Sequence, residues 1–106
     1  MKLKSLAAVA LVSLLSSGVA LATTENTKTI QQVGVQTNGL AYVLFKEPLA
    51  VACSYSLVYV DLSTTPGKGI LAVLLSAQSS GTGIARIDYT QGTDGTCIAS
   101  IVTSGS

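Results

Sequence analysis

Histidine is absent from this chain of 106 residues, and only 10% of its residues are charged. Without an imidazole, no Ser–His or Cys–His pair can activate a nucleophile, and no serine lies in a G-x-S-x-G motif. Histidine is also the commonest metal ligand in proteins. The chain offers no replacement for it, because it has no acidic cluster and no closely spaced pair of cysteines. We therefore expect a protein that is not an enzyme and that holds no metal and no cofactor.

Clusters of basic residues are absent as well. Beyond residue 22, the basic residues stand singly, at Lys28, Lys46, Lys68 and Arg86, against five acidic residues, which gives this part of the chain a net charge of −1. Proteins that bind nucleic acids or anionic membranes concentrate basic side chains on one surface. We expect no nucleic-acid partner and no stable insertion into a membrane.

The N-terminus, MKLKSLAAVALVSLLSSGVALA, has the three parts of a secretory signal peptide. Two lysines open it, an apolar run covers residues 6–15, and A-L-A forms a small-residue cleavage signature at its end. The apolar run is shorter than the roughly 20 residues that a membrane span needs. We predict cleavage of residues 1–22 after Ala22. The remaining chain, residues 23–106, is then a single domain in a secreted or periplasmic protein.

Two cysteines, Cys53 and Cys97, lie in the exported domain. Their spacing lacks the C-x-x-C pattern of a redox pair, and an oxidising compartment favours a disulfide. Closing a loop of about 45 residues would stabilise the domain by about 4 kcal/mol in the chain-entropy description. We predict one structural disulfide between these two residues.

Residue patterns beyond the leader predict five strands. Residues 23–28 are polar and are expected to fray. Alternation of apolar and polar residues predicts a first strand over residues 29–37, and Asn38-Gly39 supplies the two left-handed positions of a tight hairpin turn. The other strands are expected in residues 40–48, 54–62, 84–90 and 97–103.

The stretch DLSTTPGKGILAVLLSAQSSG, residues 61–81, has some features of a phosphate-binding loop around Lys68. The motif G-x-x-x-x-G-K-[ST] requires a first glycine where this chain has Leu62, and a hydroxyl residue where it has Gly69. A phosphate loop is therefore rejected. A weaker anion site at the helix start is the remaining functional interpretation, and a solvated, capped helix is the structural one.

The same stretch predicts a helix. Thr65 is expected to cap it through its hydroxyl group, Pro66 suits the first helical position, and Gly81 or Gly83 ends it. One apolar face collects Ile70, Leu71, Leu74 and Ala77, and is widened by Val73 and Leu75.

The predicted fold is therefore mainly β with one helix, an α+β domain with the order strand-strand-strand-helix-strand-strand. That order matches a five-stranded OB-like barrel. Gly34, within the first strand, would allow the sharp bend that a small barrel needs. A plain antiparallel sheet covered by one helix would give the same pattern, so the open sheet stays an alternative.

Tyrosines are the most informative candidates for a binding site. Tyr42, Tyr55 and Tyr59 lie on the second and third strands, the region through which OB barrels bind oligonucleotides and oligosaccharides. Tyr89, near Arg86 and Asp88, is expected to be the most exposed tyrosine. The candidate ligand contacts are Tyr42, Tyr59, Lys68, Arg86, Asp88 and Tyr89. Core packing is the alternative role for each tyrosine.

Carboxylates are the remaining candidates for catalysis, since a pair of them can hydrolyse a glycoside. The available ones are Glu47, Asp61, Asp88 and Asp94. Solvated strand ends and turns explain these positions more simply. A hydrolase requires a closely spaced acidic pair in a cleft.

Taken together, the leader, the strand pair through Asn38-Gly39, Cys53 before the third strand, the helix PGKGILAVLLSAQSSG and Cys97 at the last strand resemble small exported bacterial proteins of the OB type. More distantly, the chain resembles the B subunits of pentameric toxins, especially the subtilase-cytotoxin kind. The resemblance covers about residues 30–102. It implies glycan recognition by a ring of subunits whose helices line the centre.

The function that we expect is a secreted or periplasmic, non-enzymatic binding module for a carbohydrate or a protein surface, with self-association as an option. The alternative is a small inhibitor or accessory protein of an extracellular enzyme, which would present an exposed loop from residues 92–96 or 47–52. A carboxylate hydrolase is the third hypothesis.

Overall fold

The computed structural model describes residues 21–105 of the chain. The predicted signal peptide lies almost entirely outside these residues, so it and the cleavage after Ala22 stay predictions. The described elements are strands β1 (Leu21–Lys28), β2 (Ile30–Val35), β3 (Leu40–Phe45), β4 (Val58–Asp61), β5 (Ile84–Gln91) and β6 (Cys97–Ser104), a short 3-10 helix η1 (Ser54–Ser56) and helix α2 (Thr65–Ser80).

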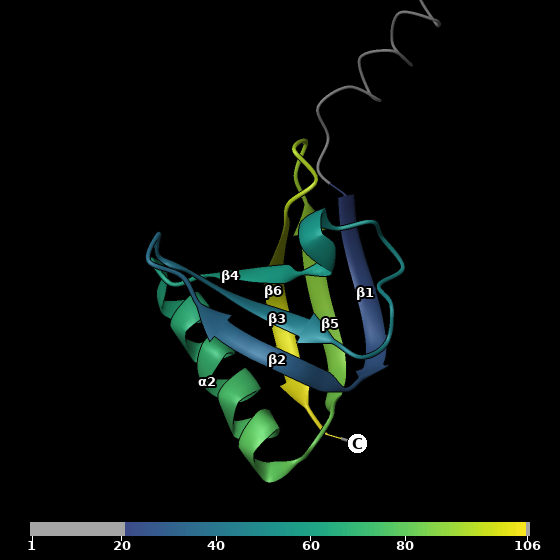
Figure 1. The fold of residues 1–106 in the computed structure, drawn as a ribbon, viewed down its shortest axis with the longest axis vertical. Coiled ribbons are helices and arrows are strands. Elements are labelled where there is room, and N and C mark those ends of the chain that lie inside the picture. The colour runs from purple at the N-terminus through teal and green to yellow at the C-terminus, as the bar shows by residue number, and fades with distance from the viewer. Residues whose placement is uncertain (1–20, 106) are drawn as a thin grey trace, which may run out of the picture.

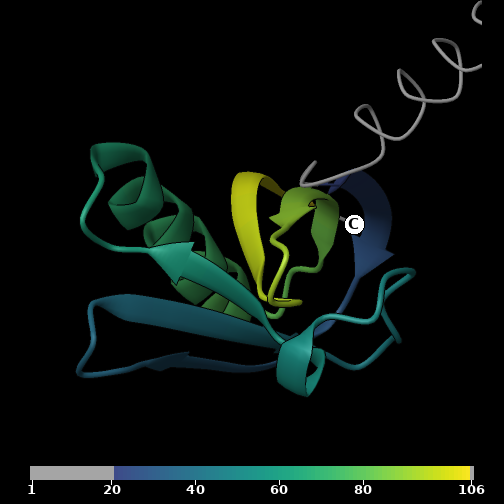
Figure 2. The same ribbon diagram turned by 90° about the horizontal axis from the view of Figure 1, so that it is seen from above.

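The strands form one six-stranded mixed sheet in the order β1-β5-β6-β4-β3-β2. All neighbours are antiparallel except β4 and β6, which run parallel. Figure 1 shows β2, β3 and β4 crossing in front of β5 and β6, with β1 to the right of β5. Figure 2 shows the strands from above, with α2 on the side of β2, β3 and β4. The α+β class with one helix is confirmed.

The strand pairing differs from the predicted architecture in three respects. Within residues 21–105 no strand pairing joins β1 to β2, so the sheet is open and the predicted five-stranded closed barrel is not found. The alternative, a plain antiparallel sheet, fails because β4 and β6 are parallel. The additional strand is β1, which includes the segment 23–28 that was expected to fray and pairs with β5 along its length.

The chain turns sharply between β1 and β2. Thr29 alone separates the two strands, and Thr27 has a left-handed backbone with φ of 57°. A bulge follows, between Ile30 and Gln32. Gly34, which was expected to make the bend, instead lies in regular pairing with Tyr42 on β3. The bend therefore occurs before the predicted position.

The loop between β2 and β3 also differs from the prediction. Gly39 has the left-handed backbone that was expected, with φ of +85°, whereas Asn38 does not. Asn38 instead accepts a hydrogen bond from the Leu40 amide through its side-chain oxygen, at 3.2 Å. The Gln36 amide donates to the Leu40 carbonyl across the loop, at 2.7 Å. The turn is thus present with only one left-handed residue.

Helix α2 packs on β6, β4 and β2. Its buried side is the predicted one, with Ile70, Leu74 and Ala77 in the core, because these positions recur at helical spacing. Leu75, which was expected to widen this face, is 45% exposed. The sheet supplies the other wall of the core, mainly from Val43, Val58, Val60, Ile84, Ile87 and Tyr89.

The helix starts one residue earlier than predicted. Thr64, not Thr65, is the N-cap, and its side-chain oxygen accepts a hydrogen bond from the Gly67 amide at 3.0 Å. Pro66 lies in the first turn, where a missing amide hydrogen costs nothing. Gly81 ends the helix in the left-handed conformation, with φ of 72°, as predicted. Within residues 21–105, no helix is both long and apolar enough to cross a membrane.

The predicted disulfide between Cys53 and Cys97 is confirmed. Both cysteines are buried, and they join the chain just before η1 to the first residue of β6. Formation of this bond is typical of proteins that fold in an oxidising compartment.

Candidate functional site

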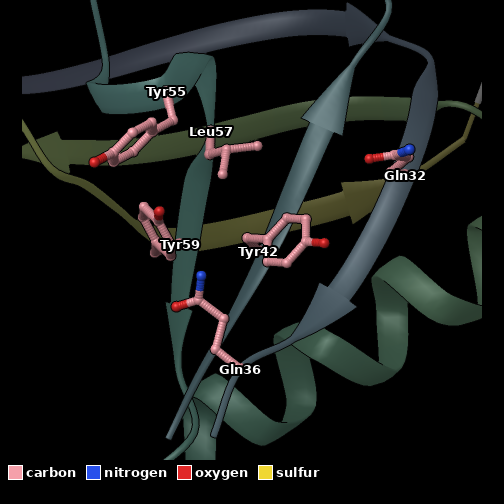
Figure 3. A pocket seen from close by; sticks show the side chains of 6 residues that line it. All are labelled: Gln32, Gln36, Tyr42, Tyr55, Leu57 and Tyr59. Atoms are coloured by element: carbon pink, nitrogen blue, oxygen red, sulfur yellow. The ribbon is translucent and has the colours of Figure 1, made fainter. Parts of the chain in front are cut away.

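A depression on the outer face of β2, β3 and β4 is the candidate functional site (Figure 3). Its volume of about 500 Å³ lies in the range of small-molecule sites. Three tyrosines, two glutamines and one leucine line it: Gln32, Gln36, Tyr42, Tyr55, Leu57 and Tyr59. We call it the tyrosine depression. Two of the predicted ligand contacts, Tyr42 and Tyr59, meet here.

Strand alternation places these side chains. In β3, Ala41, Val43 and Phe45 are buried, so the intervening Tyr42 points to the outer face of the sheet. Tyr42 and Tyr59 are direct partners across β3 and β4, in reach of each other. Tyr59 is only 8% exposed, so its ring mainly forms the base of the depression.

On the other side of Tyr42, its direct partner on β2 is Gly34. A Cβ atom at position 34 would collide with the far end of the Tyr42 ring. The ring therefore lies over the backbone of Gly34, in space that any larger residue would occupy. Gly34 is a residue of the site that sequence reasoning missed, since it was assigned to a bend.

Tyr55 is the most exposed aromatic residue of the site, at 86%. Its backbone is left-handed, with φ of 59°, and so is that of Ser56, with φ of 58°. Such a conformation costs a residue other than glycine about 1–3 kcal/mol and is often found at functional sites. Tyr55 was expected on a strand and was not among the predicted contacts, because no sequence signal indicates two consecutive left-handed residues.

Neighbouring contacts hold Tyr55 in this conformation. Cys53, two residues before it, is tied to β6 by the disulfide. The Ser54 amide donates to the Gly95 carbonyl at 2.9 Å, and the Leu57 amide donates to the Ser54 carbonyl at 3.2 Å. The turn that carries Tyr55 is therefore held by a disulfide and by two backbone hydrogen bonds.

The lining of the tyrosine depression carries no charged side chain. Each glutamine offers two amide hydrogens and an acceptor oxygen, and each tyrosine a hydroxyl group. Figure 3 shows Gln32 and Gln36 on either side of Tyr42, with Tyr59 and Tyr55 beyond it. Such a surface can stack on a ring and form hydrogen bonds with neutral groups.

The other predicted contacts do not line the depression. Arg86 and Asp88 form a two-point ion pair on β5, with Nε to Oδ1 at 3.0 Å and Nη2 to Oδ2 at 2.8 Å. The hydrogen bond from Arg86 lowers the pKa of Asp88. Lys68 is exposed in the first turn of α2. There the Gly67 amide is already used by the cap.

Tyr89 was expected to be exposed, and this prediction is wrong: it is 1% exposed. Its hydroxyl group donates to the Glu25 carboxylate. Burial, together with that neighbouring carboxylate, raises the pKa of Tyr89. The prediction relied on the nearby charged residues Arg86 and Asp88. Both are less buried than Tyr89, because strand alternation places them on the other face of β5.

The carboxylates that were considered for catalysis make local contacts. Glu47 accepts from the Thr29 amide at 2.6 Å, Asp61 from the Ser63 amide at 2.9 Å, and Asp94 from the Thr96 amide at 3.0 Å. None of them lines the tyrosine depression. Among residues 21–105, no group of three or more His, Cys, Asp or Glu side chains could hold a metal ion.

Comparisons of the chain with protein-family models, with characterised proteins and with solved structures find no match.

Proposed function

We propose that this protein is a non-enzymatic binding module that recognises carbohydrate through the tyrosine depression. The observation that carries the proposal is the convergence of Tyr42, Tyr55 and Tyr59 with two glutamines in one uncharged depression. Aromatic rings suit the apolar faces of sugars, and amide groups suit their hydroxyl groups. Neither contact needs a basic residue, which agrees with the scattered charges of the chain.

The proposed fold type is OB-like, with β1 and β2 as the two halves of one long first strand. Two observations support it. Thr29 alone separates β1 from β2, and these two strands are the opposite ends of the sheet order. OB folds bind oligosaccharides on the face of their second and third strands, which in this scheme are β3 and β4, the strands that carry Tyr42 and Tyr59.

Export is also part of the proposal. The bonded cysteines favour an oxidising compartment, and the leader favours a secreted or periplasmic location. N-terminal sequencing of the exported protein tests the leader and its cleavage site, and we expect Thr23 as the first residue. Any other first residue would contradict the predicted cleavage site.

A glycan array tests the carbohydrate proposal. The exported protein is expected to bind at least one glycan above background. The variant Tyr55→Ala should lose this binding, because it removes an exposed ring without opening a cavity in the core. Lys68→Ala, on the exposed start of α2, is the matched control and should bind like the wild type. Absence of binding by the wild type would overturn the proposal.

A second candidate, an inhibitor of an extracellular enzyme, is favoured by the turn at residues 92–96. Its tip is exposed, yet the turn is closed by hydrogen bonds from the Gly92 amide to the Thr96 carbonyl at 2.9 Å and from the Gly95 amide to the Gly92 carbonyl at 3.1 Å. A rigid loop loses little entropy on binding. Affinity capture from the native envelope fraction should then recover one dominant enzyme.

Self-association in the manner of the toxin B subunits stays a proposal. Light scattering on the exported protein measures its mass directly. A monomer at micromolar concentration would argue against the toxin-like ring and leave the tyrosine depression as a site of one chain.

A further inference from the structure

We propose that the tyrosine depression selects neutral pyranosides and discriminates against acidic sugars. This inference rests on the proposed carbohydrate function and specifies its ligand class. It depends on three properties of the lining: its charge, the faces of its rings and its hydrogen-bonding groups.

The first property is the absence of a cation among the lining residues. A uronic acid or another acidic sugar would bring a carboxylate that needs a positive partner when it loses water. Of the four basic residues in the described chain, Lys46 and Lys68 lie outside the lining. Lys28 is buried against Glu25, and Arg86 is paired with Asp88. None of the four therefore places a positive charge in the lining of the depression.

The second property is the aromatic surface. The face of a tyrosine ring carries partial negative charge, so it attracts the C–H groups on a pyranose face and repels a carboxylate. Tyr55 presents such a ring at 86% exposure, while Tyr42 and Tyr59 are paired across β3 and β4. The three rings thus favour an uncharged ligand.

The third property is the pair of amides. Gln32, on β2, and Gln36, just after it, offer both donors and acceptors beside Tyr42 (Figure 3). A sugar hydroxyl group also donates and accepts, whereas an ionised carboxylate only accepts. The amide groups can therefore use their full capacity only with hydroxyl groups.

Matched pairs of ligands test the inference. The full exported chain is titrated at pH 7 with the methyl β-glycosides of glucose, galactose and mannose, and with the three uronic acids that differ from them only in a carboxylate at C6. Chemical shifts of the glutamine side-chain amides report binding. We expect at least one neutral glycoside to shift Gln32 or Gln36, with an affinity about ten-fold or more above that of its acidic partner.

One substitution should reverse the preference. Gln36→Lys places a cation in the depression and is expected to bring the acidic member of the best pair to equal or higher affinity than the neutral one. Gln78→Lys adds the same charge on the exposed side of α2, outside the depression, and should leave the ratio unchanged. The comparison separates the effect of a charge inside the depression on ligand preference from the effect of the net charge of the protein.

Several results would overturn the inference. Equal or tighter binding of the acidic partners by the wild type would do so, as would no shift with any of the six glycosides. Tighter binding of choline than of every glycoside would assign the rings to a quaternary ammonium group instead. In each of these cases a positive glycan array would leave the proposed carbohydrate function standing, whereas a negative array would remove both.

Discussion

The ring of Tyr42 lies over Gly34, the residue directly opposite it on the neighbouring strand. Strand glycines usually weaken a sheet because they have no side chain to pack. Here the missing side chain leaves the space that the phenol group occupies. Gly34 thereby sets the position of one ring of the tyrosine depression, although it offers the ligand no side chain.

Replacement of Gly34 by alanine should therefore damage binding more than stability. The new methyl group would meet only the far end of the Tyr42 ring, and Tyr42 is half-buried, so the ring can swing outward. We expect the free energy of unfolding to change by less than about 1 kcal/mol. The affinity for a glycan identified on the array should fall about ten-fold or more.

Gly69→Ala is the matched control for this substitution. Nothing lies within 4 Å of a Cβ atom at this position in helix α2. The change should stabilise the protein by about 0.5–1 kcal/mol and leave glycan affinity unchanged. Full glycan affinity in Gly34→Ala would contradict the assigned role of Gly34. Urea denaturation and the array supply both measurements.

The N-terminal cap of α2 gives a prediction that distinguishes two adjacent threonines. Thr64→Ala should destabilise the protein by about 1 kcal/mol, because the Gly67 amide loses its acceptor. Thr65→Ala should be nearly neutral, since its side chain lies in the first helical turn. Chemical denaturation measures both changes. A larger loss for Thr65→Ala would restore the cap position that was expected from the sequence.

The disulfide is expected to supply a large share of the stability. Replacing both Cys53 and Cys97 by alanine opens a loop with a sequence separation of 44 residues. This should cost about 4 kcal/mol, against a total of about 5–15 kcal/mol for a typical domain. Denaturation of the wild type under reducing conditions should give a similar loss. A loss below about 1 kcal/mol for the double variant would contradict the prediction.

The elements that sequence could predict are those fixed by local chemistry. The helix follows from its apolar spacing and from Gly81, and the disulfide follows from two cysteines with no other partner. Strand β1 could not be predicted, because the polar segment TTENTK reads as solvated unless Glu25 and Lys28 are known to meet in a buried pair. That pairing depends on the surrounding tertiary structure.

The candidate site could be predicted only where local sequence patterns determine it. Tyr42 and Tyr59 follow from strand alternation, which sets the face of each side chain. The exposure of Tyr55 depends on a left-handed turn that is held by contacts with Cys97 and Gly95. The burial of Tyr89 depends on Glu25, which lies 64 residues away in the chain. Contacts over such distances leave no local pattern.

The buried carboxylate of Glu25 connects β1 to the loop before η1. It lies 2.8 Å from the Lys28 ammonium group, accepts from the Ala50 amide at 3.0 Å and accepts from the Tyr89 hydroxyl group. Lys28 in turn donates to the Pro48 carbonyl at 2.8 Å. Among the described residues, no buried side-chain polar atom lacks a partner. Burial by itself would raise the pKa of Glu25, but the hydrogen bonds from Lys28, Tyr89 and Ala50 together hold it below its ordinary value of 4.5.

This lowered pKa predicts a loss of stability in acid. The unfolded chain takes up the proton more readily than the folded one, so the contribution of Glu25 is complete above its ordinary pKa and is lost as the pH falls through the lower folded value. Glu25→Gln should destabilise the protein by about 3 kcal/mol at pH 7, since it leaves the Lys28 charge buried without its partner. The variant should also lose less stability than the wild type between about pH 5 and pH 3. Asp94→Asn, at an exposed turn, is the control and should cost at most about 1 kcal/mol. Urea denaturation across this pH range measures all three proteins, and parallel acid limbs for the wild type and Glu25→Gln would show that other carboxylates cause the loss.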